Sequence, residues 1–280
     1  MTKSMSQSSQ PASFYDGLSK QELAAKAAGI RVTDGTPRIN GATDAKTYYD
    51  VQNNPDKYLD KIYDVIENYY HIYDTVTIEA TNVGGRTCQE HTGTLTKQMQ
   101  LDFALLSIYA EVDYTLILGT MLHESSWQEE PPDWNGTSTA SGCMQLLDSI
   151  YNDYAADSGA YYDEYSDMRA LAEKLGADFS QKNDFLANAT VGMCAYMEWQ
   201  SYSFGADISQ VVNHYGDGST VEENYYYVNG EKKYLPSIDW VLSSSTIEIL
   251  YYRDLLALEA GIEPWYIGKL YDKDGNRLEQ

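Results

Sequence analysis

Apolar side chains recur at helical spacing along two neighbouring segments in the middle of the chain. In the first, they lie at i, i+3, i+4, i+7 and i+11 and predict a helix with a buried face: Leu101, Ala104, Leu105, Ile108 and Val112. In the second, a nearly continuous apolar run predicts a mostly buried helix over Tyr114–Trp127. Because Ile117, Met121 and Glu124 are spaced i, i+4, i+7, the carboxylate shares a helix face with two core side chains.

The position of Glu124 suits this side chain to acid–base chemistry in a way that an exposed glutamate does not share. A carboxylate held against apolar surface is partly desolvated, which raises its pKa and lets it act as a general acid near neutral pH. A solvated or paired glutamate at a helix end is the ordinary alternative. The residues that follow Glu124 favour its interpretation as a general acid over this alternative.

The same patterns predict further elements on both sides of these helices. In chain order they are a short helix over Gln21–Ala28, a helix with Tyr58, Ile62, Ile66 and Tyr69 on one face, a strand over Thr75–Glu79, a hairpin over Tyr225–Tyr234, and a closing helix over Ile247–Leu258. The hairpin is indicated by Asn229–Gly230, which supplies the positive φ that a two-residue turn needs.

The amino-acid composition limits the classes of molecule that the protein can bind. The net charge of −23 argues against nucleic acid or an anionic membrane surface, because both would repel the chain. No stretch approaches the ~20 apolar residues of a membrane span, and the first residues lack the apolar core of a signal peptide. The 26 tyrosines against five Phe suit sugar stacking or partner interfaces, since tyrosine joins a flat apolar face to a polar tip.

Histidine and cysteine spacing predicts neither a metal nor a cofactor. The chain has four histidines scattered along its sequence, namely His71, His91, His123 and His214. No Cys/His cluster in the sequence has metal-ligand spacing. His123-Glu124 begins like a zinc-protease motif, but Trp127 stands where the second histidine must be. Three cysteines are too few for a disulfide scaffold, so we expect free thiols, although a Cys143–Cys194 bridge stays open.

Four blocks of residues follow one another in an order that resembles a known family. They are Glu124-Ser125-Ser126-Trp127, Ser141-Gly142-Cys143-Met144-Gln145-Leu146, the run Asn188–Gly192, and the run Asn213–Gly218. Together they resemble the lytic transglycosylases, whose fold is that of soluble lytic transglycosylase and goose-type lysozyme. The resemblance covers roughly Leu95 to Leu258.

The resemblance implies a mainly α, lysozyme-like helical domain that cleaves peptidoglycan glycan strands. Glu124 would protonate the oxygen between N-acetylmuramic acid and N-acetylglucosamine, then deprotonate the muramic C6 hydroxyl and so close a 1,6-anhydro ring. Ser125 would orient Glu124, and Gln145 with the backbone at Met144 would contact the N-acetyl sugar. Tyr215 would hydrogen-bond the acid or the substrate, and Asn213 from the same block is a further candidate for substrate binding.

Two residues depart from the family pattern. Cys143 replaces the usual core leucine, and Gly216 stands where the family has asparagine. A Cys143–His214 pair imitates a cysteine peptidase, but a thiol at a core position is more consistent with a structural role.

Two alternatives to the transglycosylase remain open. If a water is activated instead, the enzyme is a muramidase, and Asp133 is the candidate second carboxylate. A catalytically silent structural or assembly protein with the same fold is the other alternative.

The resemblance also divides the chain. We expect a polar arm or linker over residues 1–40, an accessory helical region over 41–94, a lysozyme-like domain with a small hairpin over 95–260, and a tail over 261–280. A wall-cutting enzyme without an export signal suggests delivery to the cell wall by a virion, phage tail, or secretion or conjugation machine. The N-terminal region would then be a docking surface.

Overall fold

The computed structural model describes a mainly helical protein. The residues described are 31–33, 36–38, 57, 59–67, 70–83, 86–110, 112–129, 139–201, 208–217, 225–228, 231–234, 244–265 and 267. The helices among them are α3 (Leu59–Glu67), α4 (Lys97–Ala110), α5 (Tyr114–Ser125), α6 (Asp148–Ala155), α7 (Ser166–Lys174), α8 (Phe185–Ser201), α9 (Ile208–Asp217) and α10 (Ser244–Glu259). The predicted mainly α fold class is therefore confirmed over these residues.

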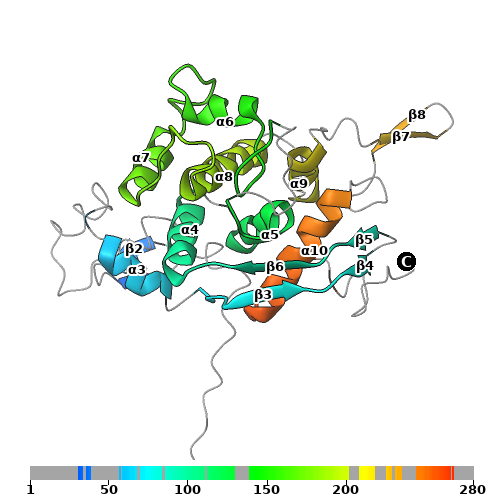
Figure 1. Cartoon of the computed structure of the whole chain (residues 1–280), viewed down its shortest axis with the longest axis horizontal. Helices are drawn as coiled ribbons and strands as arrows, with labels where there is room; N and C mark the ends of the chain where they lie inside the picture. The colour runs from blue at the N-terminus through cyan, green and yellow to red at the C-terminus, as the bar shows by residue number, and fades with distance from the viewer. Residues whose placement is uncertain are drawn as a thin grey trace, which may run out of the picture.

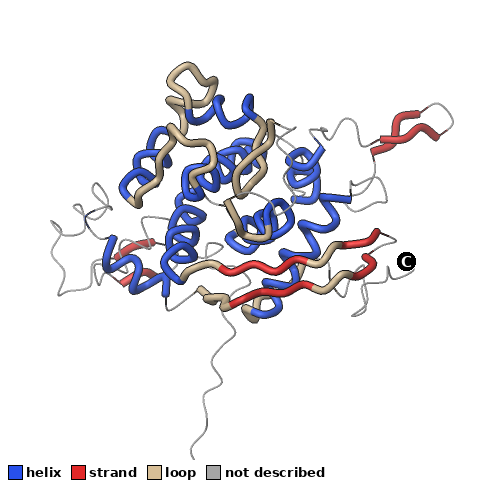
Figure 2. The backbone as a smooth tube through the Cα atoms, in the orientation of Figure 1, coloured by secondary structure: helices blue, strands red, loops and turns tan. Residues whose placement is uncertain are grey.

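Short antiparallel strand pairs accompany the helices. They are β1 (Arg31–Thr33) with β2 (Thr36–Arg38), β3 (Thr75–Ile78) with β6 (His91–Thr94), β4 (Thr81–Val83) with β5 (Arg86–Cys88), and β7 (Tyr225–Val228) with β8 (Glu231–Tyr234). Figures 1 and 2 show α6, α7 and α8 on one side of α4 and α5, and the β3–β6 pair on the other. Helix α5 packs chiefly on α10, and α4 packs on α8 and α3.

Helix α4 is buried on more than the predicted face. The five residues of the apolar stripe are all buried, and so are Phe103, Ser107 and Gln100 on other faces. Gln100 is compatible with burial because its side chain replaces water: Nε2 donates to the carbonyl of Tyr73 at 2.8 Å, and Oε1 accepts from the Tyr73 amide at 2.8 Å. The helix period therefore located α4 correctly but understated how deeply it lies in the core.

The described residues between 59 and 94 pack on these helices as a layer of the same core. Ile62 and Ile66 of α3 are fully buried, and strand β3 turns Val76 and Ile78 inward, so the predicted helix and strand are both confirmed. The expected Tyr58 and Tyr69 lie outside the described residues.

The predicted hairpin and closing helix are also confirmed. Strands β7 and β8 pair in antiparallel register from Tyr225↔Tyr234 to Val228↔Glu231. Helix α10 covers the predicted Ile247–Leu258 and ends at Glu259. Gly261 follows it with φ 73°, and the amide of Ile262 then donates to the carbonyl of Ala257 at 2.7 Å.

Other predictions fall on residues that are not described, namely the helix over Gln21–Ala28, the turn at 229–230, Asp133, and the tail beyond residue 267. None of the described helices is long and apolar enough to cross a membrane.

Helices α5 and α10 approach each other unusually closely. A Cβ at Gly119 would lie 2.8 Å from the backbone nitrogen of Arg253, so α5 needs glycine where α10 crosses it. Beside this contact the buried Arg253 guanidinium donates to Asp113 at 3.0 Å. Since Asp113 also caps α5 by accepting from the amide of Leu116 at 3.0 Å, the start of α5 is fixed to α10.

Candidate functional site

Glu124 lies half-buried in the last turn of α5, and the backbone amide of the C-cap residue Ser126 donates to the carbonyl of Leu122 at 3.0 Å. The chain leaves the helix through two left-handed residues, Ser126 with φ 53° and Trp127 with φ 59°. The Trp127 ring is buried, and its Nε1 donates to the carbonyl of Leu118 at 2.8 Å. Left-handed non-glycine backbone costs free energy, and such strain often concentrates at functional sites.

The block Ser141–Leu146 forms a closed turn beside this helix end. The backbones of Ser141 and Leu146 exchange hydrogen bonds of 3.1 and 3.0 Å, and Gly142 has φ 79°. A Cβ at Gly142 would lie 2.2 Å from Nδ2 of Asn188, so the position needs glycine for space as well as for backbone conformation. The partly exposed Gln145, at φ 47°, donates from Nε2 to the carbonyl of Gly142 at 2.9 Å.

Asn188 and Ser125 fasten the turn from two sides. Asn188 on α8 accepts from the Met144 amide at 2.8 Å and donates to the carbonyl of Ser141 at 3.1 Å. From α5, the Ser125 hydroxyl reaches the carbonyls of Cys143 at 2.9 Å and Met121 at 3.0 Å. Ser125 therefore positions Glu124 through the backbone and the turn, which is less direct than the contact that the resemblance implies.

Tyr215 on α9 is the third fastening point. Its hydroxyl donates to the carbonyl of Met144, and its ring stacks on Tyr196 with centroids 4.9 Å apart. The Tyr196 hydroxyl in turn lies 3.0 Å from Oγ1 of Thr120 on α5. The ring stack thus joins α9, α8 and α5 around the turn.

The structure brings five of the six predicted site residues together and places the sixth apart. Glu124 and Ser125 lie at the end of α5, Met144 and Gln145 lie on the turn beside it, and Tyr215 reaches the turn from α9. Asn213 is buried in the α9–α10 contact, where its side-chain oxygen accepts from Thr246 at 3.0 Å. Asn188, from the third of the four blocks, also belongs to the site, although the resemblance assigned it no role.

The electrostatics of the site favour protonated groups. Burial raises the pKa of Glu124, the charge of Glu248 raises it further, and the charge of His123 opposes both. Burial, followed by the charge of Glu124, also raises the pKa of Tyr215. A raised pKa makes a carboxyl a better match for proton transfer to a leaving oxygen near neutral pH.

The cysteine-peptidase hypothesis is not supported by the structure. Cys88, Cys143 and Cys194 are all buried and free, as expected in preference to a bridge. Burial raises the pKa of the Cys143 thiol, whose Sγ donates to the carbonyl of Phe185 at 3.4 Å. A thiol that resists ionisation is a poor nucleophile.

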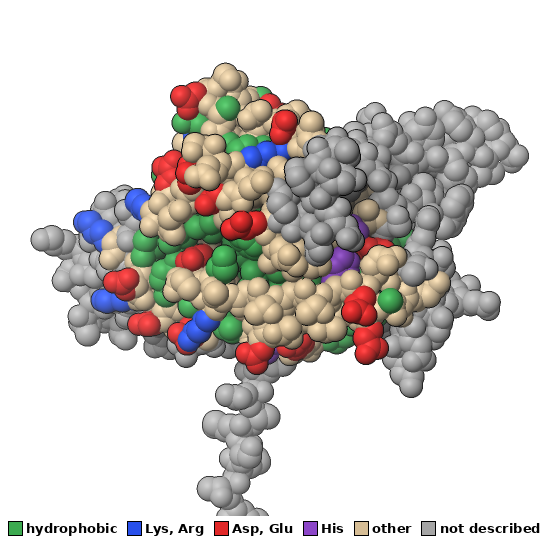
Figure 3. Space-filling view, viewed as in Figure 1, with side chains coloured by type: hydrophobic (Ala, Val, Ile, Leu, Met, Phe, Trp, Pro, Cys, Tyr) green, Lys and Arg blue, Asp and Glu red, His purple; other side chains and the backbone are tan. Residues whose placement is uncertain are grey.

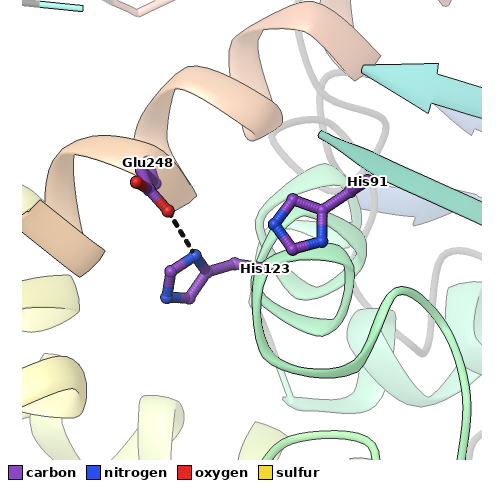
Figure 4. Close-up of side chains that lie close together, drawn as sticks. All are labelled: His91, His123 and Glu248. Atoms are coloured by element: carbon purple, nitrogen blue, oxygen red, sulfur yellow. Dashed lines mark ion pairs between the residues drawn. The ribbon is translucent and has the colours of Figure 1, made fainter. Parts of the chain in front are cut away.

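A second cluster of side chains lies next to Glu124 and was not apparent from the spacing of residues along the sequence. His91, His123 and Glu248 come from β6, α5 and α10, and each presents a ligand atom within 4.8 Å of the others (Figure 4). Two of the four histidines, His91 and His123, are therefore close together in space although they lie far apart along the sequence. Residues so far apart along the chain meet only through the β3–β6 pairing and the α5–α10 contact, so spacing could not reveal the cluster.

Charges within this cluster act on each ring differently. Burial lowers the pKa of His91, and the charge of His123 lowers it further, against Glu248. Burial also lowers the pKa of His123, but the close Glu248 carboxylate and the charge of Glu124 outweigh it, so the pKa is raised overall. Nδ1 of His123 lies 2.9 Å from Oε2 of Glu248.

Acidic side chains are spread over the face of the molecule in Figure 3, in keeping with the net charge of −23.

Comparison of the chain with protein families, with curated proteins and with solved structures finds no significant match.

Proposed function

We propose that the protein is a lytic transglycosylase that cuts the β-1,4 bond between N-acetylmuramic acid and N-acetylglucosamine in peptidoglycan. The observation that carries this proposal is the fastening of the turn Ser141–Leu146 beside Glu124 by Ser125, Asn188 and Tyr215. This arrangement sets one carboxyl next to a hydrogen-bonded turn whose Ser141 and Gln145 are partly exposed. A glycosidase that works with one acid/base residue needs such a pairing of proton donor and sugar-binding surface.

The chemistry balances with one carboxyl group. Glu124 gives its proton to the glycosidic oxygen as the bond to the muramic C1 breaks, and N-acetylglucosamine leaves with a free hydroxyl. The resulting carboxylate then takes the proton of the muramic C6 hydroxyl while O6 bonds to C1. Glu124 ends protonated as it began, no water is consumed, and the product carries a 1,6-anhydro ring.

The substrate would lie across the turn. Gln145 is partly exposed and belongs to the turn, so its amide and the neighbouring backbone can bond an N-acetyl group. Met144 has its amide and carbonyl engaged by Asn188 and Tyr215, and we propose that it shapes the sugar site rather than bonding the sugar. Such a substrate would place the action of the enzyme at the cell wall.

The muramidase alternative requires a second carboxylate on the opposite side of the sugar. Asp133, its candidate, lies outside the described residues. The charge of Glu248 acts on Glu124, but the Glu248 carboxylate faces His123. The fragments that the protein releases from peptidoglycan distinguish the two reactions from each other and from a catalytically silent structural protein.

The test is mass spectrometry of soluble fragments released from purified peptidoglycan. Wild-type protein should release fragments one water lighter than reducing muropeptides. Glu124→Gln should release none while keeping its circular dichroism and melting temperature. Glu129→Gln, which changes an exposed acid five positions further on, is the matched control and should act like wild type.

Each other outcome has a distinct meaning. Reducing fragments that depend on Glu124 would assign a muramidase. If wild-type protein released no fragments from several wall types, the lytic proposal would be overturned in favour of a structural role.

A further inference from the structure

Three side chains with metal-binding atoms converge beside the end of α5 and are not used in the proposed glycosidase chemistry. His91 comes from β6, His123 from α5 and Glu248 from α10, and their ligand atoms lie within 4.8 Å of one another. Figure 4 shows the two imidazole rings and the carboxylate facing a common space. The three elements that supply them also pack on one another, with α5 on α10 and β6 on α5.

The orientation of each group suits ligation. Nδ1 of His91 lies 2.9 Å from the hydroxyl oxygen of Ser126, and in Figure 4 the other ring nitrogen faces the pair formed by His123 and Glu248. Nδ1 of His123 is buried and lies 2.9 Å from Oε2 of Glu248, but outside hydrogen-bond geometry. Within the described part of the chain this nitrogen has no hydrogen-bond partner. The nitrogen and the carboxylate already form an ion pair, and both are atom types that bind zinc.

We infer that His91, His123 and Glu248 form a site for a divalent transition-metal ion, with zinc as the best chemical match. Two imidazoles and one carboxylate form a donor set that zinc accepts, whereas magnesium and calcium prefer oxygen ligands alone. Ligands on one tetrahedral zinc lie roughly 3.4 Å apart when each bond is about 2.1 Å long. The His123–Glu248 pair is already near that separation, and closing the third side requires only a small side-chain movement.

The surroundings resemble those of an established metal ligand set. A ligating histidine usually gives its second ring nitrogen to an oxygen that fixes its tautomer and orientation. Ser126 offers that oxygen to His91 from a left-handed position with φ 53°. Tyr252 adds an aromatic wall, with its ring 5.3 Å from that of His91 and 6.2 Å from that of His123.

The role that this geometry supports is structural. An ion at this site would join β6, α5 and α10 at the residue before Glu124, and so hold the helix end in place. Ions that bind the folded state alone stabilise it by mass action. This inference does not depend on the proposed lytic activity, because the ligands are identified by their own geometry.

The test is calorimetric titration of zinc chloride into purified protein made metal-free by dialysis against a chelator. Wild type should bind one equivalent and melt at a higher temperature with zinc than without it. His91→Gln and Glu248→Gln each remove one ligand and should weaken binding on the order of 100-fold or more. Ser126→Gly removes the supporting hydroxyl, suits the left-handed backbone, and should weaken binding on the order of 10-fold.

The matched control is His71→Gln, which changes a histidine that pairs with Glu259 away from the cluster and should leave zinc binding unchanged. Cobalt substitution gives a second readout that does not depend on the variants. Bound Co²⁺ in the wild type should show the intense visible absorption of a four-coordinate ion.

Three results would each overturn the inference. They are no zinc binding by the wild type, binding that survives unchanged in both His91→Gln and Glu248→Gln, and a cobalt spectrum like that of the hydrated ion.

Discussion

The side-chain hydroxyl of Ser125 lies 2.9 Å from the carbonyl oxygen of Cys143 and donates a hydrogen bond to it. This bond joins the last turn of α5, which carries Glu124, to the turn that we propose binds the sugar. Both partners are buried, so water cannot replace the bond. One hydroxyl therefore helps to set the distance between the acid and the turn.

Replacing Ser125 by alanine should damage both stability and activity. The buried carbonyl of Cys143 would lose its partner, which costs about 1–3 kcal/mol of the free energy of unfolding. The turn would also be free to move relative to Glu124, so fragment release from peptidoglycan should fall more than the folded fraction does. Urea unfolding and fragment release measured on the same preparation test this. Ser149→Ala, at an exposed serine of α6, should change neither.

Gly142→Ala should disrupt the turn more than backbone strain alone would. Its φ of 79° disfavours any side chain, and the added Cβ would lie 2.2 Å from Asn188. Gly176→Ala isolates the first effect, because Gly176 has φ 107° and nothing within 4 Å of an added Cβ. Strain alone costs about 1–3 kcal/mol, and Gly142→Ala should exceed the measured cost of Gly176→Ala. Equal losses of unfolding free energy in the two variants, measured with denaturant, would show that the Asn188 side chain moves aside at little cost.

Much of the fold could be predicted because its signals are local. The helix period located α4 and α5, and Asn229–Gly230 with its flanking residues predicted the β7–β8 hairpin. Strand β6 escaped prediction because its sequence, His-Thr-Gly-Thr, has no apolar alternation, and its pairing with β3 is set by the turned-in Val76 and Ile78.

The candidate site could be predicted only where a resemblance supplied it. Glu124 and the turn at Gln145 were found from ordered blocks, but the role of Asn188 depends on bonds to a turn more than 40 residues earlier. The cluster of His91, His123 and Glu248 was missed for the same reason. Contacts between distant segments follow from packing, which no spacing rule along the chain records.

Asp113→Ala should be among the most destabilising single changes in the described core. It would remove the side-chain cap of α5 and leave the buried Arg253 without one of the two carboxylates that pair with it among the described residues. Breaking a buried pair costs about 3–5 kcal/mol. Glu67→Ala, which breaks the exposed Lys97–Glu67 pair, should cost less than about 1 kcal/mol. Chemical unfolding of both variants tests the contrast, and similar losses would count against it.

Asp102→Asn should stabilise the protein at neutral pH and lose that advantage in acid. Burial raises the pKa of Asp102 above 3.8, against hydrogen bonds from Tyr63 at 2.5 Å and Gln98 at 3.0 Å. A raised folded-state pKa means that protonation favours folding. The stability that Asp102 contributes is complete below the unfolded-state pKa and is lost as pH rises through the folded-state pKa.

Asparagine imitates the protonated acid, because its oxygen can still accept from Tyr63 and Gln98. The difference in unfolding free energy between Asp102→Asn and wild type should therefore grow as pH rises from near 3.8 and level off above the folded-state pKa. Urea unfolding across that range measures it. Asp74→Asn, at an exposed aspartate before β3, should give a flat difference. A flat difference for Asp102→Asn as well would mean that the carboxyl is better solvated than its burial implies.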